Sequence, residues 1–336
     1  MFETNWCGVA ATTVILFCSH NVFAWSANEH KTVALIAWDL LTQDTSAPAK
    51  TAVSKIQTIL NSLGSGTTLE DIAPCADQLR GESDDPPTGV CTKFQTMSQS
   101  EPWHFIAIPI TDSPQNESDL NQYCTGENSC VANQVRANLQ TLQTTTDLSS
   151  QEQALIFLVH FVGDQHQPLH NAEEIINGKS DDGGNDEPVT LTLNDKTTKL
   201  DLHSVWDYQI EPSDSDNNPE TESQTLEASL PDATTQAQWI SGDYITTATL
   251  ESFQFAQSNI YPDYNNTGPD QGCQGSSLNA TYQTTMVPTI NGRLQRAGVR
   301  LKALLISAFN PTTTTTTQST TTTTTQPTTT TQPTTN

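Results

Sequence analysis

Two pairs of histidine and aspartate, each spaced four residues apart, most constrain how this chain can fold. The pairs are His160 with Asp164 and His203 with Asp207. Residues four apart share one face of an α-helix, so each pair predicts a helix that presents an imidazole and a carboxylate together. His170 follows the first pair after Pro168, a residue that ends or kinks a helix. Imidazole and carboxylate ligands without thiolates are typical of catalytic zinc, so these residues predict a metal site.

The apolar surroundings of both pairs strengthen this interpretation. A lone histidine on an apolar helix is more often a packed core residue than a ligand. Here a carboxylate follows one turn later, and burying it without a partner would be costly, whereas a shared metal ion offsets the desolvation.

The hydrophobic pattern predicts a mainly α fold, a single helical domain with at most a small β-hairpin. A capping box at Ser149 or Ser150 with Glu152 and Gln153 is expected to open the helix that carries His160. The acidic segment 211–238 and the segment 261–277 are interpreted as surface loops. The predicted helices cover residues 28–41, 52–63, 202–210 and 288–309, and a further helix runs from 149 or 150 through Phe161 to an end or kink at Pro168. The hairpin joins 189–193 to 199–202.

The ends of the chain predict an exported protein. An apolar stretch at 9–17 is too short for a membrane anchor, and Val22 and Ala24 supply the small residues of a cleavage site before Trp25, although a basic region before the stretch is missing. We therefore expect a signal peptide at 1–24, a domain at 25–309, and a Thr/Gln/Pro-rich tail at 310–336. The tail is either disordered or an O-glycosylated stalk. No later segment is apolar enough to span a membrane, so the product is expected to be secreted.

The cysteines suit an oxidising compartment. Cys7 and Cys18 would leave with the leader, and five of the seven cysteines remain. Cys124 and Cys130 bracket a short turn and are expected to form a disulfide. Of Cys75, Cys91 and Cys273, one must stay unpaired or pair between molecules, and we favour Cys75 with Cys91. Reduced, buried cysteines are the alternative.

The net charge is −25, which taken alone argues against a protein that binds nucleic acid. A cluster of divalent metal ions would reverse the sign of the charge inside one pocket, however, and the pocket's charge matters more than the total. The acidity therefore does not exclude a phosphate-bearing substrate.

The order of these motifs resembles the zinc-dependent, single-strand-specific nucleases of the S-one/P-one type, over residues 25–309. Each motif alone would be weak, but together they are specific. The motifs are Trp25 with His30, Asp77 with Arg80, Trp103-His104-Phe105, His160 to His170, Asp182-Gly-Gly-Asn185, and Leu202-His-Ser-Val-Trp-Asp207.

The resemblance implies three zinc ions per chain. The first would be bound by Asp77, His104, His160 and Asp164. The second would be bound by His170, His203 and Asp207. The third would be bound by His30, by Asp164 as a bridge, and by the α-amino nitrogen and carbonyl oxygen of Trp25. Because an amine is a ligand only at a free terminus, removal of the leader becomes a step in building the site. This ligand set is complete without His166, so the resemblance implies that His166 supports or packs against the site and does not bind metal.

The resemblance also implies a phosphodiesterase mechanism, since bound zinc lowers the pKa of water from about 16 toward 7. Asp77 would orient or deprotonate the attacking water, Arg80 would contact the phosphate, and Phe105 would stack on a base. The implied substrates are single-stranded DNA, RNA and 3′-mononucleotides, cleaved to leave 5′-phosphates on nucleic acids, with no stable protein partner. Ala107 and Tyr208 depart from the family's base-binding pattern, so a weak or altered base preference is expected.

Two alternatives remain. A zinc-dependent phospholipase C would share the helical fold, but the short Trp25 to His30 spacing, Asp207 in place of glutamate, and Arg80 argue against it. A non-catalytic zinc-binding or adhesion protein would be expected to lack at least one ligand, and none is missing. Sequons at Asn116, Asn265 and Asn279 matter only in a host that glycosylates.

Overall fold

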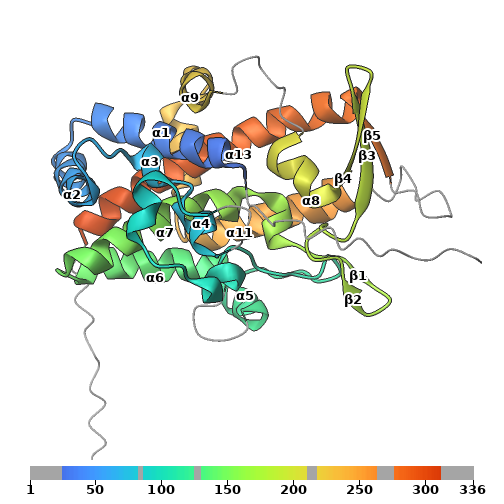
Figure 1. Cartoon of the computed structure of the whole chain (residues 1–336), viewed down its shortest axis with the longest axis horizontal. Helices are drawn as coiled ribbons and strands as arrows, with labels where there is room; N and C mark the ends of the chain where they lie inside the picture. Colours follow the sequence, from blue (N-terminus) through green and yellow to red (C-terminus); the bar gives the residue numbers. More distant parts are fainter. Residues whose placement is uncertain (1–24, 82–85, 125–129, 210–217, 263–275, 312–336) are drawn as a thin grey trace, which may run out of the picture.

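The computed structural model describes residues 25–81, 86–124, 130–209, 218–262 and 276–311. The predicted leader, the tail beyond residue 311, Cys273 and Asn265 therefore lie outside the described residues. The chain within these limits is mainly helical, as predicted (Figure 1). The longer helices are α1 (Ala27–Gln43), α2 (Ala47–Leu63), α6 (Val131–Thr144), α7 (Leu148–His166), α9 (Pro219–Ala228), α10 (Ala233–Trp239), α11 (Tyr244–Phe255) and α13 (Ala280–Phe309).

Short helices connect these elements and carry several polar residues of the site. They are α3 (Leu69–Ile72), α4 (Cys75–Leu79), η1 (Gly89–Lys93), η2 (Ser98–Trp103), α5 (Glu117–Leu120), η3 (Asn121–Tyr123), η4 (Pro168–Asn171), α8 (Leu202–Ser204), the π-helix η5 (Val205–Gln209) and the π-helix η6 (Ala256–Ile260).

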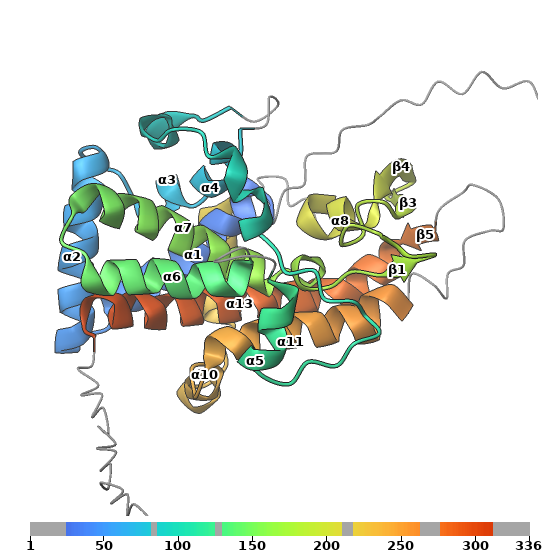
Figure 2. The same ribbon diagram turned by 90° about the horizontal axis from the view of Figure 1, so that it is seen from below.

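Helix α7 forms the centre of the molecule. Every residue from 154 to 166 is buried, and a helix that is apolar on most sides needs neighbours on every face. α1, α6 and α13 run along it, and α2 crosses their ends at one side of the molecule (Figure 2). Because α7 is enclosed in this way, any polar side chain on it must find a partner inside the protein.

The strands lie at the opposite end from α2 (Figure 1). β3 (Pro188–Leu193) and β4 (Lys196–Asp201) form the predicted antiparallel hairpin, and β5 (Ser276–Asn279) adds a parallel third strand to β3. Asn194 and Asp195 both have positive φ, as the two-residue type I′ turn requires. A second pair, β1 (Ile175–Ile176) with β2 (Lys179–Ser180), was not predicted, so the strand content exceeds one hairpin.

Three local predictions were wrong. α7 is capped by Asp147, which accepts from the Ser150 amide, and not by a capping box at Ser149 or Ser150. The segment interpreted as an acidic loop contains α9 and nearly all of α10; on α9 Glu220 is exposed, whereas Leu226 is buried. Helix α13 begins at Ala280 and continues through Pro288, so it starts eight residues before the predicted boundary at 288.

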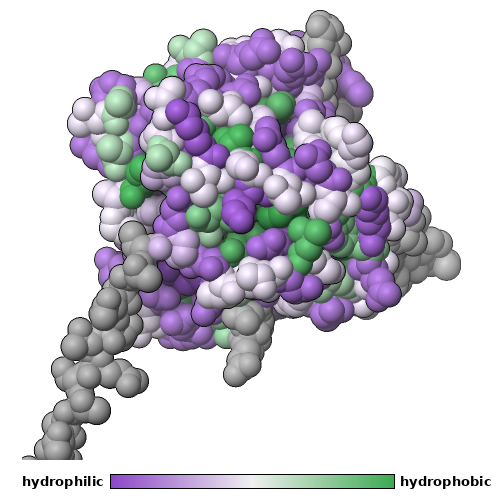
Figure 3. Space-filling model, turned by 90° about the vertical axis from the view of Figure 1, so that its left-hand side faces the viewer, coloured by the Kyte–Doolittle hydropathy of each residue, from purple (hydrophilic) through white to green (hydrophobic). Residues whose placement is uncertain are grey.

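Both favoured disulfides are confirmed: Cys75 pairs with Cys91, and Cys124 with Cys130. The face at the α2 end carries mostly hydrophilic residues and residues of intermediate hydropathy, with small, separate hydrophobic areas (Figure 3). Within the described ranges, no helix is long and apolar enough to cross a membrane.

Candidate metal centre

The eight predicted side-chain ligands come from seven elements or their ends and meet inside the protein. All are buried, with at most 6% of any one of them exposed. They form three groups: His30 with His160 and Asp164, Asp77 with His104 and His160, and His170 with His203 and Asp207. His160 belongs to two groups, so the first two are one continuous cluster beside α7.

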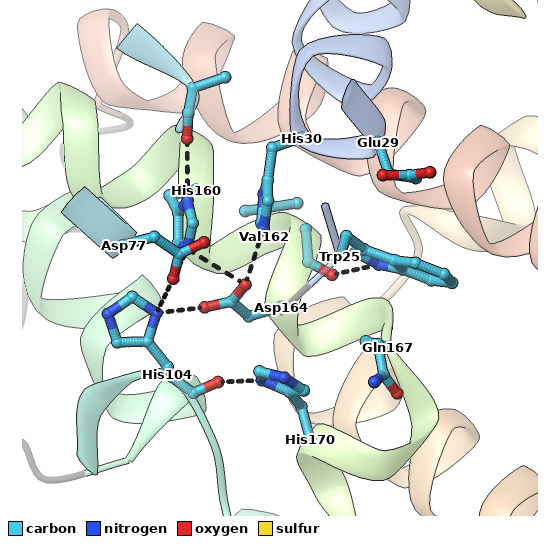
Figure 4. Close-up of polar contacts among 12 residues, drawn as sticks. Trp25, Glu29, His30, Asp77, His104, His160, Val162, Asp164, Gln167 and His170 are labelled. Carbon is cyan, nitrogen blue, oxygen red and sulfur yellow. Dashed lines mark hydrogen bonds and ion pairs between the residues drawn. The ribbon is translucent and has the colours of Figure 1, made fainter. Parts of the chain in front are cut away.

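Asp164 lies at the middle of that cluster (Figure 4). Its Oδ1 is 3.2 Å from His30 Nε2 and 3.3 Å from His160 Nε2, and its Oδ2 is 2.9 Å from His104 Nδ1. One carboxylate therefore faces imidazoles from three different elements. This arrangement suits a bridging ligand.

His160 is oriented by the main chain. Its Nδ1–H donates to the Ala73 carbonyl oxygen at 2.8 Å, which turns Nε2 toward Asp77 Oδ1 at 3.3 Å. The His30 ring stacks on the His160 ring with centroids 3.8 Å apart. An imidazole whose Nδ1–H is held by a carbonyl presents Nε2 as the ligand atom, which is the usual support for a metal-binding histidine.

In the second group, two further histidines are oriented by hydrogen bonds to main-chain carbonyls. His170 Nδ1 donates to the His104 carbonyl and His203 Nδ1 to the Gly183 carbonyl, both at 2.8 Å. The two Nε2 atoms then face each other at 3.0 Å, and Asp207 Oδ2 lies 3.4 Å from His203 Nε2. Gln167 holds Asp207 by donating to its Oδ1 at 2.7 Å.

The chemistry of these atoms fits metal cations. Among the described residues, His30 Nε2, His160 Nε2, Asp77 Oδ1 and Asp164 Oδ1 are buried without a hydrogen-bond partner. Such groups are costly unless a cation or a proton satisfies them. Four buried polar atoms converging on one region is the pattern expected of ligands.

Burial and neighbouring charges set the protonation of the centre. Burial lowers the pKa of His104 to about 4 and also lowers the pKa of His30 and of His170. At His160 burial acts in the same direction, but the Asp164 and Asp77 carboxylates outweigh it and raise the pKa to about 10. Burial raises the pKa of Asp207 well above its usual range. Divalent cations would replace the protons on His160 and Asp207, because ligands bind metal in their deprotonated forms.

Trp25 is placed beside both clusters. Its indole Nε1–H donates to the Gly163 carbonyl at 3.0 Å, and the next residue, Ser26, donates its amide to the Asp207 carbonyl at 3.0 Å. The indole is fully buried, so the start of the predicted mature chain is anchored to α7 and η5.

The predicted substrate residues line a cleft next to the second group. Arg80 and Phe105 share it with His170, His203 and Ala107. Arg80 is 3% exposed, and one of its guanidinium nitrogens is 3.4 Å from Asp77 Oδ1. The side chain of Tyr208 lies outside the described residues.

Several residues of the site were not predicted. The carbonyl oxygens of Ala73, His104 and Gly183 carry no side-chain signal in a sequence, and only the fold brings them to the imidazoles. Asp182 and Gly183 belong to the Asp182-Gly-Gly-Asn185 motif, but that motif gave the Gly183 carbonyl no role. Glu101 and Glu173, which line the cleft together with Asp182, were missed because they come from separate segments.

His166 does not reach the ligands. Its Nδ1–H donates to the Val162 carbonyl at 2.7 Å, and its Nε2 accepts from Arg300 on α13 at 2.9 Å. This contact ties the end of α7 to α13, which agrees with the packing role expected for it.

A helical scaffold that buries a continuous cluster of imidazoles and carboxylates beside a cleft has the arrangement of a metal-dependent enzyme. The family model described as S1/P1 nuclease matches residues 25–310, and the chain belongs to this family. It is a nuclease, a hydrolase of nucleic acids in a metal-dependent family.

Proteins similar to the chain include plant and fungal nucleases. Endonuclease 2 of Arabidopsis thaliana is 27% identical over 313 residues, which cover 89% of this chain and 95% of the relative. Nuclease P1 of Penicillium citrinum is 28% identical over 291 residues, covering 82% and 95%. Nuclease S1 of Aspergillus oryzae is 26% identical over 205 residues, covering 60% and 59%.

Proposed function

We propose that the protein is a zinc-dependent endonuclease that hydrolyses phosphodiester bonds of single-stranded DNA and RNA to 5′-phosphate products. We include a 3′-nucleotidase activity on 3′-mononucleotides. The family supports the nuclease class, and the imidazole and carboxylate donors without thiolates favour zinc.

Three zinc ions per chain are proposed. Asp77, His104, His160 and Asp164 would hold the first, and His170, His203 and Asp207 the second. His30, Asp164 and the α-amino nitrogen and carbonyl oxygen of Trp25 would hold the third. Bound zinc supplies a nucleophile from water near neutral pH and positive charge for the phosphoryl oxygens.

The chain's own residues orient the reaction. Asp77 is held between His160 and Arg80, so one carboxylate oxygen is available to orient or deprotonate the attacking water. Arg80 lines the cleft beside His170 and His203, where its guanidinium contacts the scissile phosphate. Phe105 lines the same cleft and stacks on the base, which favours single strands because a paired base cannot leave its stack.

The facing Nε2 atoms of His170 and His203 are the single observation that carries the proposal. Both Nδ1 atoms must donate, because their partners are carbonyl oxygens. In the neutral rings both Nε2 atoms then carry lone pairs, and two lone pairs 3.0 Å apart repel unless a cation lies between or beside them. Asp207 supplies the negative charge that such a cation needs.

Secretion is part of the proposal. Residues 1–24 would be removed before Trp25, since only a free α-amine can bind metal. No stable protein partner is required, because the ligands and the cleft all come from one chain. Base preference is proposed to be weak, because Ala107 offers no polar group to a base.

The test uses protein that begins at Trp25 and a matched form with one additional alanine before it. Zinc per chain is measured by mass spectrometry, and activity on single-stranded DNA, RNA, 3′-AMP and phosphatidylcholine is measured with and without EDTA. Three zinc ions in the first form, fewer in the second, and 5′-phosphate ends would support the proposal. Hydrolysis of phosphatidylcholine but not of nucleic acids would replace it with the phospholipase alternative.

A further inference from the structure

Two cavities share Phe105 in their lining, and one of them also contains residues of the proposed metal site. This inner cavity contains Arg80, His170 and His203. The outer cavity, of about 320 Å³, adjoins it. Phe105, Ile106, Ala107 and Glu173 line both cavities. A single strand held at the inner cavity therefore meets a second cavity at the next position.

The shared wall is rigid because two backbone segments pair along it. The Ile106 amide donates to the His170 carbonyl at 2.8 Å, and the Glu173 amide to the Ile108 carbonyl at 2.9 Å. The Ile110 amide donates to the Glu173 carbonyl at 2.9 Å, so the pairing extends beyond the wall. The wall is thus joined directly to a proposed zinc ligand, His170.

The outer cavity has the chemistry of a base-binding site. Its remaining lining residues are Pro102, Pro109, Gln122 and Tyr123. Its volume is within the range of small-ligand pockets. The Tyr123 hydroxyl donates to Asp112 Oδ2 at 2.7 Å, and the adjacent Cys124 is bonded to Cys130, so the tyrosine is tethered from both sides.

Charge decides which part of a nucleotide this cavity can take. Its lining residues include no lysine or arginine, and Glu173 contributes a carboxylate. Glu101 and Asp182 add negative charge at the inner cavity. Burial raises the pKa of Asp182, and the Asp186, Glu101 and Glu173 carboxylates raise it further, so these acids are close enough to interact. Among these lining residues Arg80 alone offers positive charge to a phosphate, and the outer cavity offers only uncharged groups and one carboxylate, which suits a base and not a phosphate.

We propose that the outer cavity is a second nucleobase subsite, which receives the base of a neighbouring nucleotide in the same strand, against Phe105 and Tyr123. This proposal rests on the proposed nuclease function and extends it to a second nucleotide of the substrate strand. Ala107 acquires a role in this arrangement: its small side chain leaves the wall thin between the two bases.

The experiment compares a 3′-mononucleotide with a dinucleotide, using the zinc-loaded protein and the variants Tyr123→Ala and Tyr123→Phe. Stacking on one aromatic ring corresponds to roughly five- to a hundredfold in affinity. We expect Tyr123→Ala to lower kcat/KM for the dinucleotide about tenfold and to leave the 3′-mononucleotide unchanged. Tyr123→Phe keeps the ring and loses only the bond to Asp112, so it is expected to retain most dinucleotide activity.

A binding measurement separates this proposal from the nuclease proposal. A dinucleotide carrying 2-aminopurine and a non-hydrolysable phosphorothioate link is titrated with each protein, and quenching of the 2-aminopurine fluorescence reports stacking. If the wild type hydrolyses neither substrate, the nuclease proposal fails, but this titration still tests the subsite. Quenching by the wild type and Tyr123→Phe, but not by Tyr123→Ala, supports the subsite. Equal loss on both substrates in Tyr123→Ala, or no quenching by the wild type, overturns it.

Discussion

Gly163 permits the close approach of His30 to α7, and replacing it should remove one metal ion selectively. A Cβ added at Gly163 would lie 2.6 Å from His30 Nδ1 and 2.8 Å from its Cε1. Ordinary contact begins at 3.4 Å, so the ring must move by 3.4 − 2.6 = 0.8 Å. Zinc–ligand distances tolerate shifts of only about 0.2 Å. Gly163→Ala should therefore lose the zinc held by His30, and a misplacement of this size can lower activity about a hundredfold.

The assay measures zinc per purified chain, kcat/KM on single-stranded DNA, and unfolding in urea. We expect zinc to fall from three to two, with a loss of about 1–3 kcal/mol in the free energy of unfolding from overpacking.

Gly298→Ala is the matched control. Its Cβ would lie 2.4 Å from Ile36 Cγ2, also on α1 but away from the ligands. It should destabilise the protein similarly and keep all three zinc ions. Gly163→Ala with three zinc ions and wild-type activity would refute the reasoning, and so would zinc loss of equal size in both variants.

Three further predictions concern charge. Arg80→Ala should lower kcat/KM on the order of a hundredfold, because it removes a group that stabilises charge in the transition state. The kcat/KM of Arg80→Lys should lie between those of Arg80→Ala and the wild type. Equal kcat/KM values in all three proteins would exclude contact between Arg80 and the phosphate. Burial raises the pKa of Asp181 to about 6. The folded protein then holds this proton more tightly than the unfolded chain does, so its contribution to stability is complete below about pH 4 and is lost as the pH rises through about 6. The free energy of unfolding in urea should decrease over this pH range in the wild type and decrease less in Asp181→Asn. Identical pH profiles of the two proteins would contradict this prediction. Finally, raising the ionic strength from about 0.01 M to 0.15 M shortens the Debye length from about 30 Å to 8 Å. The chain carries a net charge of −25 and repels nucleic acid, and salt screens this repulsion. Higher ionic strength should therefore raise kcat/KM for long single strands more than for 3′-AMP. A steep fall of kcat/KM for the long strands would show that local positive charge dominates.

The sequence predicts most of the ligand set because its signals are local. His160 with Asp164 and His203 with Asp207 depend only on helical spacing, and the fold brings them together as that spacing implies. Helix α9 was missed because periodicity in a strongly acidic segment is hard to distinguish from a solvated loop, and Leu226 alone gives little signal.

The wall between the cavities could not be predicted. Ile108 and Glu173 are far apart in sequence and meet through a backbone hydrogen bond, which depends on chain path and not on residue type. The start of α13 was missed for a related reason: the turns before Pro288 show little apolar periodicity and are helical because of their tertiary neighbours.

The carbonyl groups that hold His160, His170 and His203 have a consequence for how such a site can vary. Ala73, His104 and Gly183 supply these acceptors from the main chain, so a substitution at Ala73 leaves its acceptor in place. Ala73 is fully buried, so only small residues fit there, but Ala73→Gly and Ala73→Ser should keep this hydrogen bond, whereas any replacement of His160 removes it. The path of the backbone therefore sets the orientation of these three imidazole rings. A chain that keeps this backbone path can thus change many of its side chains and still hold its histidines in the same orientation.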